Sequence, residues 1–327
     1  MTSIAVLGAG SMGTAMAQVA AGNGHSVRLW SIELDVLAEV RDRRANSKYL
    51  PDVALEVRIE PCWGLAEALR GVEIALFSVP SQVTRAVARD AAPHLPEAAV
   101  VLNVAKGLEE GTDLRMSQVL AQELSRQGEG IVSMGGPAIA AELARHSTTA
   151  VVVAGEGPGP GTVQAAFQNE YFKVETSADV LGVELGATLK NVYAIALGMC
   201  DGLGLATNTK AFLATLAMRE MASMIEALGG KGETVFGLAG LGDLLTTGYS
   251  PHSRNRTLGE KLCTDPAWPE FLHRATVEGV AACRSARDLA WRHGLATPLL
   301  DTVHEALFEA QSPAEAMQGF LRGFAYG

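Results

Sequence analysis

Residues 4–17 read IAVLGAGSMGTAMA, and this stretch decides the fold that the sequence predicts. A short apolar run leads into a GxGxxG pattern at Gly8, Gly10 and Gly13, and a helical pattern follows. In a strand–turn–helix unit the first glycine permits a tight turn, the second lets a pyrophosphate approach the backbone, and the third lets the helix pack closely on the strand. The N–H groups at the helix start then face the phosphates. The stretch favours a dinucleotide-binding turn over a merely structural glycine turn.

The first half of the chain repeats this strand-then-helix pattern. The predicted strands are short, rich in Val, Ile, Ala or Leu, and lack clear alternation, as expected for strands buried on both faces of a parallel sheet. They span residues 3–7, 26–30, 74–79, 100–104, 131–134 and 149–154, with helical patterns at 13–22, 34–44 and 82–91. Repeated units of this kind predict an α/β, Rossmann-like doubly wound sheet.

The pattern changes after about residue 182. Long stretches rich in Ala, Leu and Met replace the strand signals at 183–199, 209–228, 274–293 and 299–308, and a glycine-rich interruption covers 229–248. We therefore expect two domains: a dinucleotide-binding, Rossmann-like domain over residues 1–182, and an all-α substrate and catalytic domain over residues 183–327.

Composition limits the classes of protein that remain. The chain has 327 residues, 48% of them hydrophobic, and 26 basic against 36 acidic residues give a net charge of −10. This composition excludes a mostly disordered chain, and the acidic balance argues against binding to nucleic acid or to an anionic membrane. We expect no membrane span because no run of 18 apolar residues occurs, and no signal peptide because the N-terminus lacks a basic region.

The cysteines and histidines show no pattern typical of disulfide bonds or metal sites. The four cysteines are irregularly spaced without a CxxC pair, and the seven histidines form no HExxH cluster. Free thiols and no metal site are the simplest interpretation, which together with the missing leader predicts a cytoplasmic protein. The apolar faces of a helical second domain favour a homodimer.

Glu33 is the candidate for selecting the cofactor. It lies twenty residues after Gly13, just past the predicted strand at 26–30, where a ribose-binding acid is expected. No arginine follows this strand immediately to bind a 2′-phosphate, so the pattern favours NAD, with NADP as the alternative. Equally, Glu33 is typical of a solvated residue at a helix start.

Cationic and small residues follow the later strands. Lys106 comes after the predicted strand at 100–104, and the carboxyl end of a parallel strand faces the ligand crevice; a surface lysine is the alternative. Residues 135–142 read GGPAIAAE, a turn at the start of a helix that offers N–H groups to an anion or simply connects two elements.

The second half carries a further polar set. Lys190 and Asn191 interrupt an apolar helical pattern, and a partly desolvated lysine can exchange a proton with a substrate oxygen, unless its side chain only reaches out to solvent. Asp243, within GLAGLGDLLTTG, is suited to orient Lys190 or to balance its charge. Arg254 offers a forked donor for phosphate, which Asn255 supplements.

Taken in order, these motifs resemble the bacterial-type NAD(P)-dependent glycerol-3-phosphate dehydrogenases. The resemblance runs nearly end to end, through GAGSMGTAMA, NSKYLP, VPS, the Lys-Gly at 106–107, GGPAIAAE, STTAVVVAG, VELGATLKNVYAIALG, GLAGLGDLLTT, SRNR and VEGV. It implies reversible hydride transfer between NAD(P)H and C2 of dihydroxyacetone phosphate, giving sn-glycerol 3-phosphate, and hence a place in glycerophospholipid metabolism. The implied partner is a small phosphorylated substrate.

The resemblance also implies roles for individual residues. Lys190 would be the proton donor and acceptor at the C2 oxygen, with Asp243 and Lys106 as further catalytic residues. The substrate-binding residues would be Lys106, Gly136, Asn191, Thr247, Ser253, Arg254 and Asn255. The cofactor-binding residues would be Gly8, Gly10, Ser11, Met12, Gly13, Glu33, Tyr49, Lys106, Ala140, Arg254 and Glu278.

The chain departs from the family pattern at a few positions. Met12 stands where the family usually has Trp, and Gly135 and Ala138 stand where it has serines, which leaves another anionic ketone open as the substrate. A β-hydroxyacid dehydrogenase is the alternative enzyme, although that family has no SRNR segment and places its Asn a helical turn after its Lys. A non-catalytic dinucleotide-binding protein is the alternative of a different class, because it would need the glycine turn alone.

Overall fold

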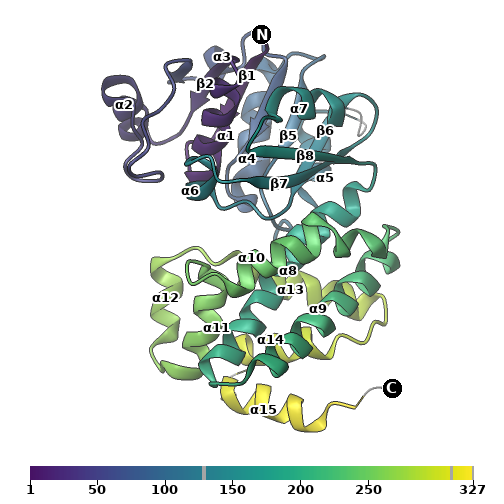
Figure 1. Cartoon of the computed structure of the whole chain (residues 1–327). Helices are drawn as coiled ribbons and strands as arrows, with labels where there is room; N and C mark the ends of the chain where they lie inside the picture. Colours follow the sequence, from purple (N-terminus) through teal and green to yellow (C-terminus); the bar gives the residue numbers. More distant parts are fainter. Residues whose placement is uncertain (127–129, 310–311, 326–327) are drawn as a thin grey trace. The chain divides into compact units, whose positions relative to one another are not determined.

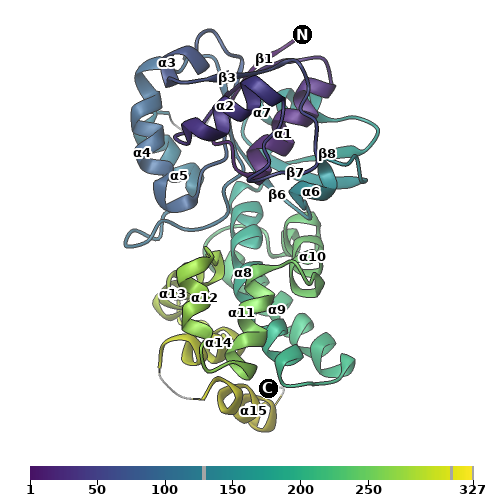
Figure 2. The ribbon, with the colours of Figure 1, turned by 90° about the vertical axis from the view of Figure 1, so that its left-hand side faces the viewer.

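The computed structural model describes residues 1–126, 130–309 and 312–325, and the chain divides into two compact units (Figures 1 and 2). Unit 1 comprises Met1–Glu109 and Leu114–Val180. Unit 2 comprises Leu181–Gly327 together with the short segment Glu110–Asp113.

Unit 1 is built on an eight-stranded sheet in the order β3-β2-β1-β4-β5-β6-β7-β8. Its strands are β1 (Ser3–Leu7), β2 (Ser26–Trp30), β3 (Ile59–Cys62), β4 (Ile74–Phe77), β5 (Val100–Asn103), β6 (Ile131–Gly135), β7 (Thr149–Gly155) and β8 (Phe172–Ser177). Neighbouring strands are parallel except β6 and β7, which pair antiparallel. The predicted Rossmann-like doubly wound sheet is therefore confirmed, with a reversal of direction at β7 that the strand patterns did not predict.

Two strands, β3 and β8, lie at the edges of the sheet and were not predicted from the sequence. The β3 sequence IEPC contains Pro61, which a sheet tolerates at an edge, and Glu60 is exposed. The β8 sequence FKVETS alternates buried and exposed residues at its start, because one of its faces meets solvent. Edge strands thus lack the continuous apolar run by which the central strands are recognised.

Helices cover both faces of this sheet (Figure 2). Within β1, Ile4 and Val6 pack into one core cluster with α1, α2 and α7, whereas Ala5 and Leu7 pack into another with α4 and α5. This alternation is the period of a strand buried on both sides. The helices of unit 1 are α1 (Ser11–Gly22), α2 (Leu34–Arg43), α3 (Leu65–Ala68), α4 (Ser81–Ala91), the 3-10 turn η1 (Ala92–His94), α5 (Met116–Glu123), α6 (Ala140–Leu143) and α7 (Gly159–Phe167).

The turn between β1 and α1 is held by a close backbone approach. A side-chain carbon placed at Gly13 would lie 1.9 Å from the Gly8 carbonyl oxygen, so helix and turn meet where only glycine fits. Gly8 itself has φ +113°, a left-handed conformation that glycine adopts without strain. The third and first glycines of the motif therefore have packing and backbone roles.

Unit 2 is helical in the part of the chain that the structure describes. Its elements are α8 (Val180–Gly202), α9 (Thr207–Ala227), the 3-10 turn η2 (Gly232–Phe236), the π-helical turn η3 (Leu238–Gly242), α10 (Asp243–Tyr249), α11 (Arg254–Thr264), α12 (Trp268–Arg274), α13 (Glu278–Arg292), α14 (Pro298–Phe308) and α15 (Pro313–Gly323). The stretch 229–248 is mostly helical rather than an open interruption, and the predicted helix at 274–293 begins at Glu278, after an extended Ala275.

The helix α8 forms the core of unit 2. Residues 182–200 of this helix are all buried, which explains why its apolar pattern runs round every face. By length and composition alone α8 would be apolar enough to cross a membrane, but 89% of its most apolar window is buried among the other helices. Its apolar character is therefore that of a core helix.

A buried carboxylate joins three helices of unit 2. Glu220 on α9 accepts hydrogen bonds from the Leu299 and Leu300 amides at the start of α14, at 2.8 and 3.0 Å, and from the Tyr193 hydroxyl on α8, at 3.0 Å. Burial raises the pKa of Glu220 to about 7, and the hydrogen bonds only partly offset this effect. Glu220 therefore fixes α8 to its neighbours at some cost when it is ionised.

This cost predicts a pH dependence of stability. Glu220 releases its proton near pH 7 in the folded chain but near 4.5 when unfolded, so the folded chain binds more protons between these values. The contribution of Glu220 to the free energy of unfolding should therefore be greatest below about pH 4.5. It should fall by about 3 kcal/mol as the pH rises from there through 7. Urea denaturation of the wild type and of Glu220→Gln across this pH range checks the prediction, because the variant has no carboxyl group to titrate at this position. If the free energies of unfolding of the two proteins changed in parallel with pH, the pH dependence would not come from Glu220.

The β1–α1 packing predicts a contrast between two glycines. Gly13→Ala should lower the free energy of unfolding by about 2 kcal/mol, since the added carbon meets the Gly8 carbonyl. Gly10→Ala is the matched control, because no atom lies within 4 Å of a carbon added there, and it should cost less than about 1 kcal/mol. Equal losses in urea denaturation would mean that helix and turn do not meet at Gly13.

Candidate active site

The glycine turn presents an open helix N-terminus. The Gly8 amide donates to the Trp30 carbonyl at 2.8 Å, which holds the turn beside the end of β2. Gly10 is the N-cap of α1, no side chain caps this end, and the first turn of α1 carries no acidic residue. No atom lies within 4 Å of a side-chain carbon placed at Gly10. A pyrophosphate fits such a site, because free N–H groups and the helix dipole both attract it.

A loop of the chain is anchored on this turn. Asn46 is fully buried, and its amide donates to the Ala9 carbonyl at 2.9 Å and to the Thr14 hydroxyl at 2.8 Å. The Ser11 hydroxyl, next along the turn, donates to the Tyr49 carbonyl at 2.8 Å. The structure thus brings Tyr49 to the glycine motif. Our interpretation of the sequence missed the role of Asn46, although its place at the head of NSKYLP is a usable signal.

Glu33 lies at the end of β2 but is not an isolated carboxylate. The Lys48 ammonium forms an ion pair with Glu33 Oε1, and this hydrogen bond, together with one from the Tyr49 hydroxyl, holds the pKa of Glu33 below its usual range. The pair also raises the pKa of Lys48. Glu33 therefore stays ionised, and Lys48 is a cation at this position that the sequence pattern did not reveal.

The predicted residues after β5 and β6 also lie together. The Lys106 ammonium donates to the Gly136 carbonyl at 3.3 Å, which joins the turns that follow the two neighbouring strands. Ala140 begins α6 and, with Met12 and Tyr49, packs against the same hydrophobic core cluster. The predicted cofactor and substrate residues of unit 1 thus line the edge formed by the carboxyl ends of the parallel strands, where ligands bind in such sheets.

The predicted site residues of unit 2 centre on a buried ion pair. Lys190 is 5% exposed and Asp243 is 2% exposed. The Lys190 ammonium donates to Asp243 Oδ1 at 2.7 Å and to the Thr247 hydroxyl at 2.5 Å. A buried ammonium is tolerated because both partners accept hydrogen bonds from it. The expected contact between Lys190 and Asp243 is present.

Local backbone geometry explains how Asp243 and Thr247 come together. The π-helical turn η3 ends at Gly242, and α10 begins at Asp243, so the carboxylate stands at a helix start. Thr247 follows four residues later and therefore lies on the same face of α10. π-Helical turns are rare and often occur at functional sites. The glycine-rich sequence before Asp243 permits this change of helical pitch.

A second polar network lies one residue further along α8. Asn191 donates to Glu278 Oε2 at 3.3 Å and accepts from the Asn255 amide at 2.9 Å. The Asn255 side-chain oxygen Oδ1 accepts from the Gly279 backbone amide at 3.0 Å. The network joins α8 to the first turns of α11 and α13, and these contacts give Asn255 a positioning role beside any contact with substrate.

The residues of SRNR divide between structural and exposed positions. Ser253 caps α11 by accepting from the Arg256 amide at 3.2 Å, and the Arg256 side chain pairs with Asp201 at 2.6 Å. Asp201 also pairs with Lys210 at 2.7 Å. Arg254, the first residue of α11, is exposed. Arg256 therefore holds the helix in place, and Arg254 is the arginine that solvent reaches.

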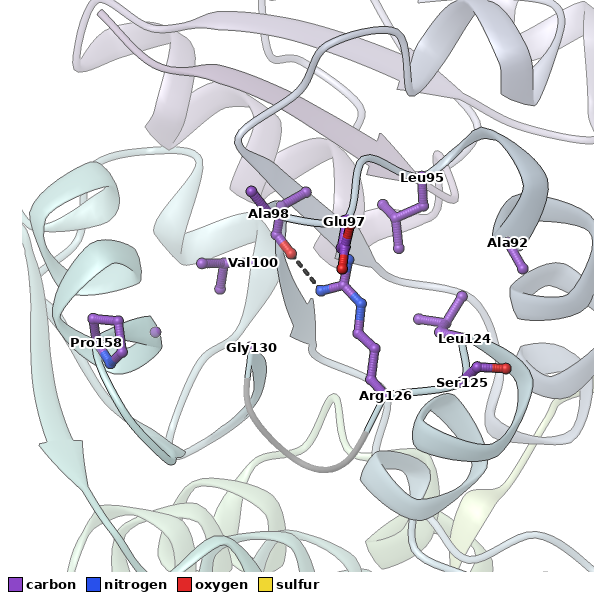
Figure 3. A pocket seen from close by; sticks show the side chains of 12 residues that line it. Ala92, Leu95, Glu97, Ala98, Val100, Leu124, Ser125, Arg126, Gly130 and Pro158 are labelled. Carbon is purple, nitrogen blue, oxygen red and sulfur yellow. Dashed lines mark hydrogen bonds between the residues drawn. The ribbon is translucent and has the colours of Figure 1, made fainter.

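A separate cavity of about 560 Å³ lies in unit 1 (Figure 3). Val100, which begins β5, lines it, so it lies at the amino end of this parallel strand, opposite the edge that carries Lys106. The Arg126 guanidinium in it donates to the Pro96 carbonyl at 2.8 Å, and burial lowers the pKa of this arginine. The cavity is thus distinct from the predicted site residues.

Known proteins provide an independent comparison. Two family models match the chain: NAD-dependent glycerol-3-phosphate dehydrogenase N-terminus over residues 3–158, and the corresponding C-terminus over residues 179–318. A glycerol-3-phosphate dehydrogenase [NAD(P)+] of Pelotomaculum thermopropionicum is 42% identical over 323 residues, covering 97% of this chain and 92% of the relative. One of Enterococcus faecalis is 38% identical over 322 residues, covering 97% and 95%.

A solved structure with a similar fold belongs to the same family as these sequence relatives. The crystal structure of glycerol-3-phosphate dehydrogenase from Coxiella burnetii superposes with a TM-score of 0.92 at 35% identity, covering 98% of each chain. The matches extend over both units and over the motifs in which Lys106, Lys190 and Arg254 lie. The chain therefore belongs to the NAD-dependent glycerol-3-phosphate dehydrogenase family.

Proposed function

We propose that this protein catalyses the reversible, NAD(P)H-linked reduction of dihydroxyacetone phosphate to sn-glycerol 3-phosphate. Membership of the family supports the reaction, and the buried contact of Lys190 with Asp243 and Thr247 is the observation that carries the chemistry. In this assignment residues 1–182 bind the dinucleotide, and residues 183–327 bind and convert the substrate.

Lys190 is the proposed proton donor. Reducing a ketone places negative charge on its oxygen, and an ammonium nearby stabilises this charge and supplies the proton. Asp243 and Thr247 hold the Lys190 ammonium in one orientation, because both accept hydrogen bonds from it. The nicotinamide supplies the hydride when the cofactor is bound. In the reverse direction Lys190 takes the proton back from the hydroxyl.

Arg254 and Lys106 are the proposed cations for the substrate. Arg254 is exposed at the start of α11, so its forked guanidinium is available to a phosphate. Lys106 contacts Gly136, and we assign both to the substrate, with Lys106 also beside the cofactor. A phosphate held at one end orients C2 for hydride transfer, which is how positioning contributes to the rate.

We further propose a homodimer in the cytoplasm. All four cysteines are free thiols, as a reducing compartment favours. Trp291 on α13 is 82% exposed, and a large exposed aromatic side chain is typical of residues that a second copy covers.

The proposed proton donor predicts a loss of turnover. Lys190→Met should lower kcat by about 10²- to 10⁴-fold while leaving the dissociation constant for NADH nearly unchanged, since the amine acts on the substrate oxygen. Lys210→Met is the matched control, because it also breaks a lysine–aspartate pair in unit 2. Steady-state kinetics and NADH titration check the prediction, and near-wild-type turnover of the Lys190 variant would remove its role.

The proposed phosphate contact predicts a change in substrate affinity. Arg254→Ala should raise the KM for dihydroxyacetone phosphate by about tenfold or more, because a charge-assisted hydrogen bond to phosphate is lost. Arg274→Ala is the control, being another exposed arginine of unit 2. A KM equal to that of the wild type in initial-rate measurements would argue against a phosphate contact at Arg254.

A further inference from the structure

The ion pair between Lys48 and Glu33 lies just past β2, and in dinucleotide-binding sheets the end of the second strand selects between the two nicotinamide cofactors. We propose that Lys48 is a specificity-determining residue, whose ammonium binds the 2′-phosphate of NADPH and so gives the site access to both NADH and NADPH. The inference rests on the proposed function, in that it names the cofactors of that reaction. Glu33 alone favours NADH.

The place of the pair in the sheet supports this assignment. β2 is parallel to β1, with Trp30 opposite Leu7, and the Gly8 amide bonds to the Trp30 carbonyl. Glu33 follows β2 by three residues, and the Ser31 hydroxyl accepts from its amide at 3.1 Å. A dinucleotide whose pyrophosphate lies on the glycine turn places its adenosine ribose at the end of the second strand. The ribose 2′ position therefore falls near Glu33.

Lys48 is held at this position from both sides. The preceding Ser47 donates through its amide and hydroxyl to Glu39 on α2, at 2.9 and 2.7 Å. The following Tyr49 is fixed through its carbonyl to Ser11 of the glycine turn. The loop is thus tied to α2 and to the dinucleotide turn at once, so the placement of Lys48 beside Glu33 follows from the architecture of the site.

Two of the arginines that follow β2 in the sequence, Arg41 and Arg44, make contacts away from Glu33. Arg41 pairs with its neighbour Asp42 at 2.6 Å and stacks over the Trp63 ring at 5.4 Å. Arg44 is the C-cap residue that follows α2, and it donates to the Ile59 carbonyl at 2.7 Å. Neither contacts Glu33 in the interactions described for these side chains. Lys48 is the cation that the structure pairs with Glu33, and we assign to it the part that an arginine plays in many NADP sites.

The pair is suited to exchange partners. The Lys48 and Glu33 side chains are 50% and 29% exposed, and an ion pair so exposed is weak and opens readily. A phosphomonoester carries more charge than a carboxylate near neutral pH and attracts the ammonium more strongly. With NADH, the ammonium stays on Glu33 Oε1, and the carboxylate has lone pairs left to accept a ribose hydroxyl. Lys48 also neutralises Glu33, which would otherwise repel the 2′-phosphate.

The test compares ratios for the wild type, Lys48→Gln and Lys48→Arg. Lys173→Gln serves as the control, because Lys173 is an exposed lysine of the same unit on the edge strand β8. Two readouts are taken: the ratio of kcat/KM for NADPH to that for NADH, and the ratio of the dissociation constants of 5′-AMP and 2′,5′-ADP from calorimetric titration. The fragments need no turnover, so they test Lys48 even if dihydroxyacetone phosphate is not the substrate.

Lys48→Gln should lower the preference for 2′,5′-ADP over 5′-AMP, and that for NADPH over NADH, by about tenfold, since a charged contact to phosphate is lost. Lys48→Arg and the control should stay within about threefold of the wild type. A fall of less than about threefold in the fragment ratio of Lys48→Gln overturns the inference. If the enzyme reduces dihydroxyacetone phosphate but Lys48→Gln leaves the ratio of the fragment dissociation constants unchanged, only the role of Lys48 is overturned. If the fragment ratio changes but dihydroxyacetone phosphate is not reduced, only the proposed reaction is overturned.

Discussion

The buried ion pair of Lys190 and Asp243 is the interaction on which the proposed chemistry of unit 2 depends. A lysine that is only 5% exposed is tolerated only with acceptors in place, and removing one partner of such a pair typically destabilises a protein strongly. The pair therefore ties the register of α8 to that of α10, and the π-helical turn before Asp243 is the backbone irregularity that makes this alignment fit. Neighbouring polar contacts through Asn191 and Asn255 extend the constraint to α11 and α13.

In unit 1 the constraint concerns the backbone of the glycine turn between β1 and α1. Its site must leave backbone N–H groups free for an anion, so the turn after β1 uses glycines and no capping side chain. The buried amide of Asn46 and the hydroxyl of Ser11 then attach the following loop to this turn. The side chains that we assign to the adenosine end of the site are thereby attached to the glycine turn that we assign to the pyrophosphate.

Sequence patterns predicted the parts of the fold in which one local rule dominates. The bounds of β1 and β2 agree with the predicted strands, because continuous apolar runs mark strands buried on both faces. The edge strands β3 and β8 were missed, since exposure on one side breaks that run. The helices at 183–199 and 209–228 were found within a few residues of α8 and α9 because periodicity over many residues is a strong signal.

In the candidate site, too, some contacts could be predicted from sequence motifs and others could not. Lys190, Asp243 and Lys106 were predicted as site residues because their motifs are long and ordered, and these assignments stay predictions. The structure shows the contacts of Lys190 with Asp243 and of Lys106 with Gly136. The ion pair of Lys48 with Glu33 was not predicted, because the two residues lie on different elements and no spacing rule links them. Glu220 was missed for the same reason: its donors come from α8 and from the start of α14.

We expect this chain to reduce a phosphorylated three-carbon ketone, and one spectrophotometric screen can establish whether it does. NADH oxidation would be followed with dihydroxyacetone phosphate, unphosphorylated dihydroxyacetone and small keto acids under one set of conditions. Oxidation should be rapid with dihydroxyacetone phosphate and slower by orders of magnitude with the other compounds. Faster oxidation with a keto acid, or equal rates with and without the phosphate, would contradict this expectation.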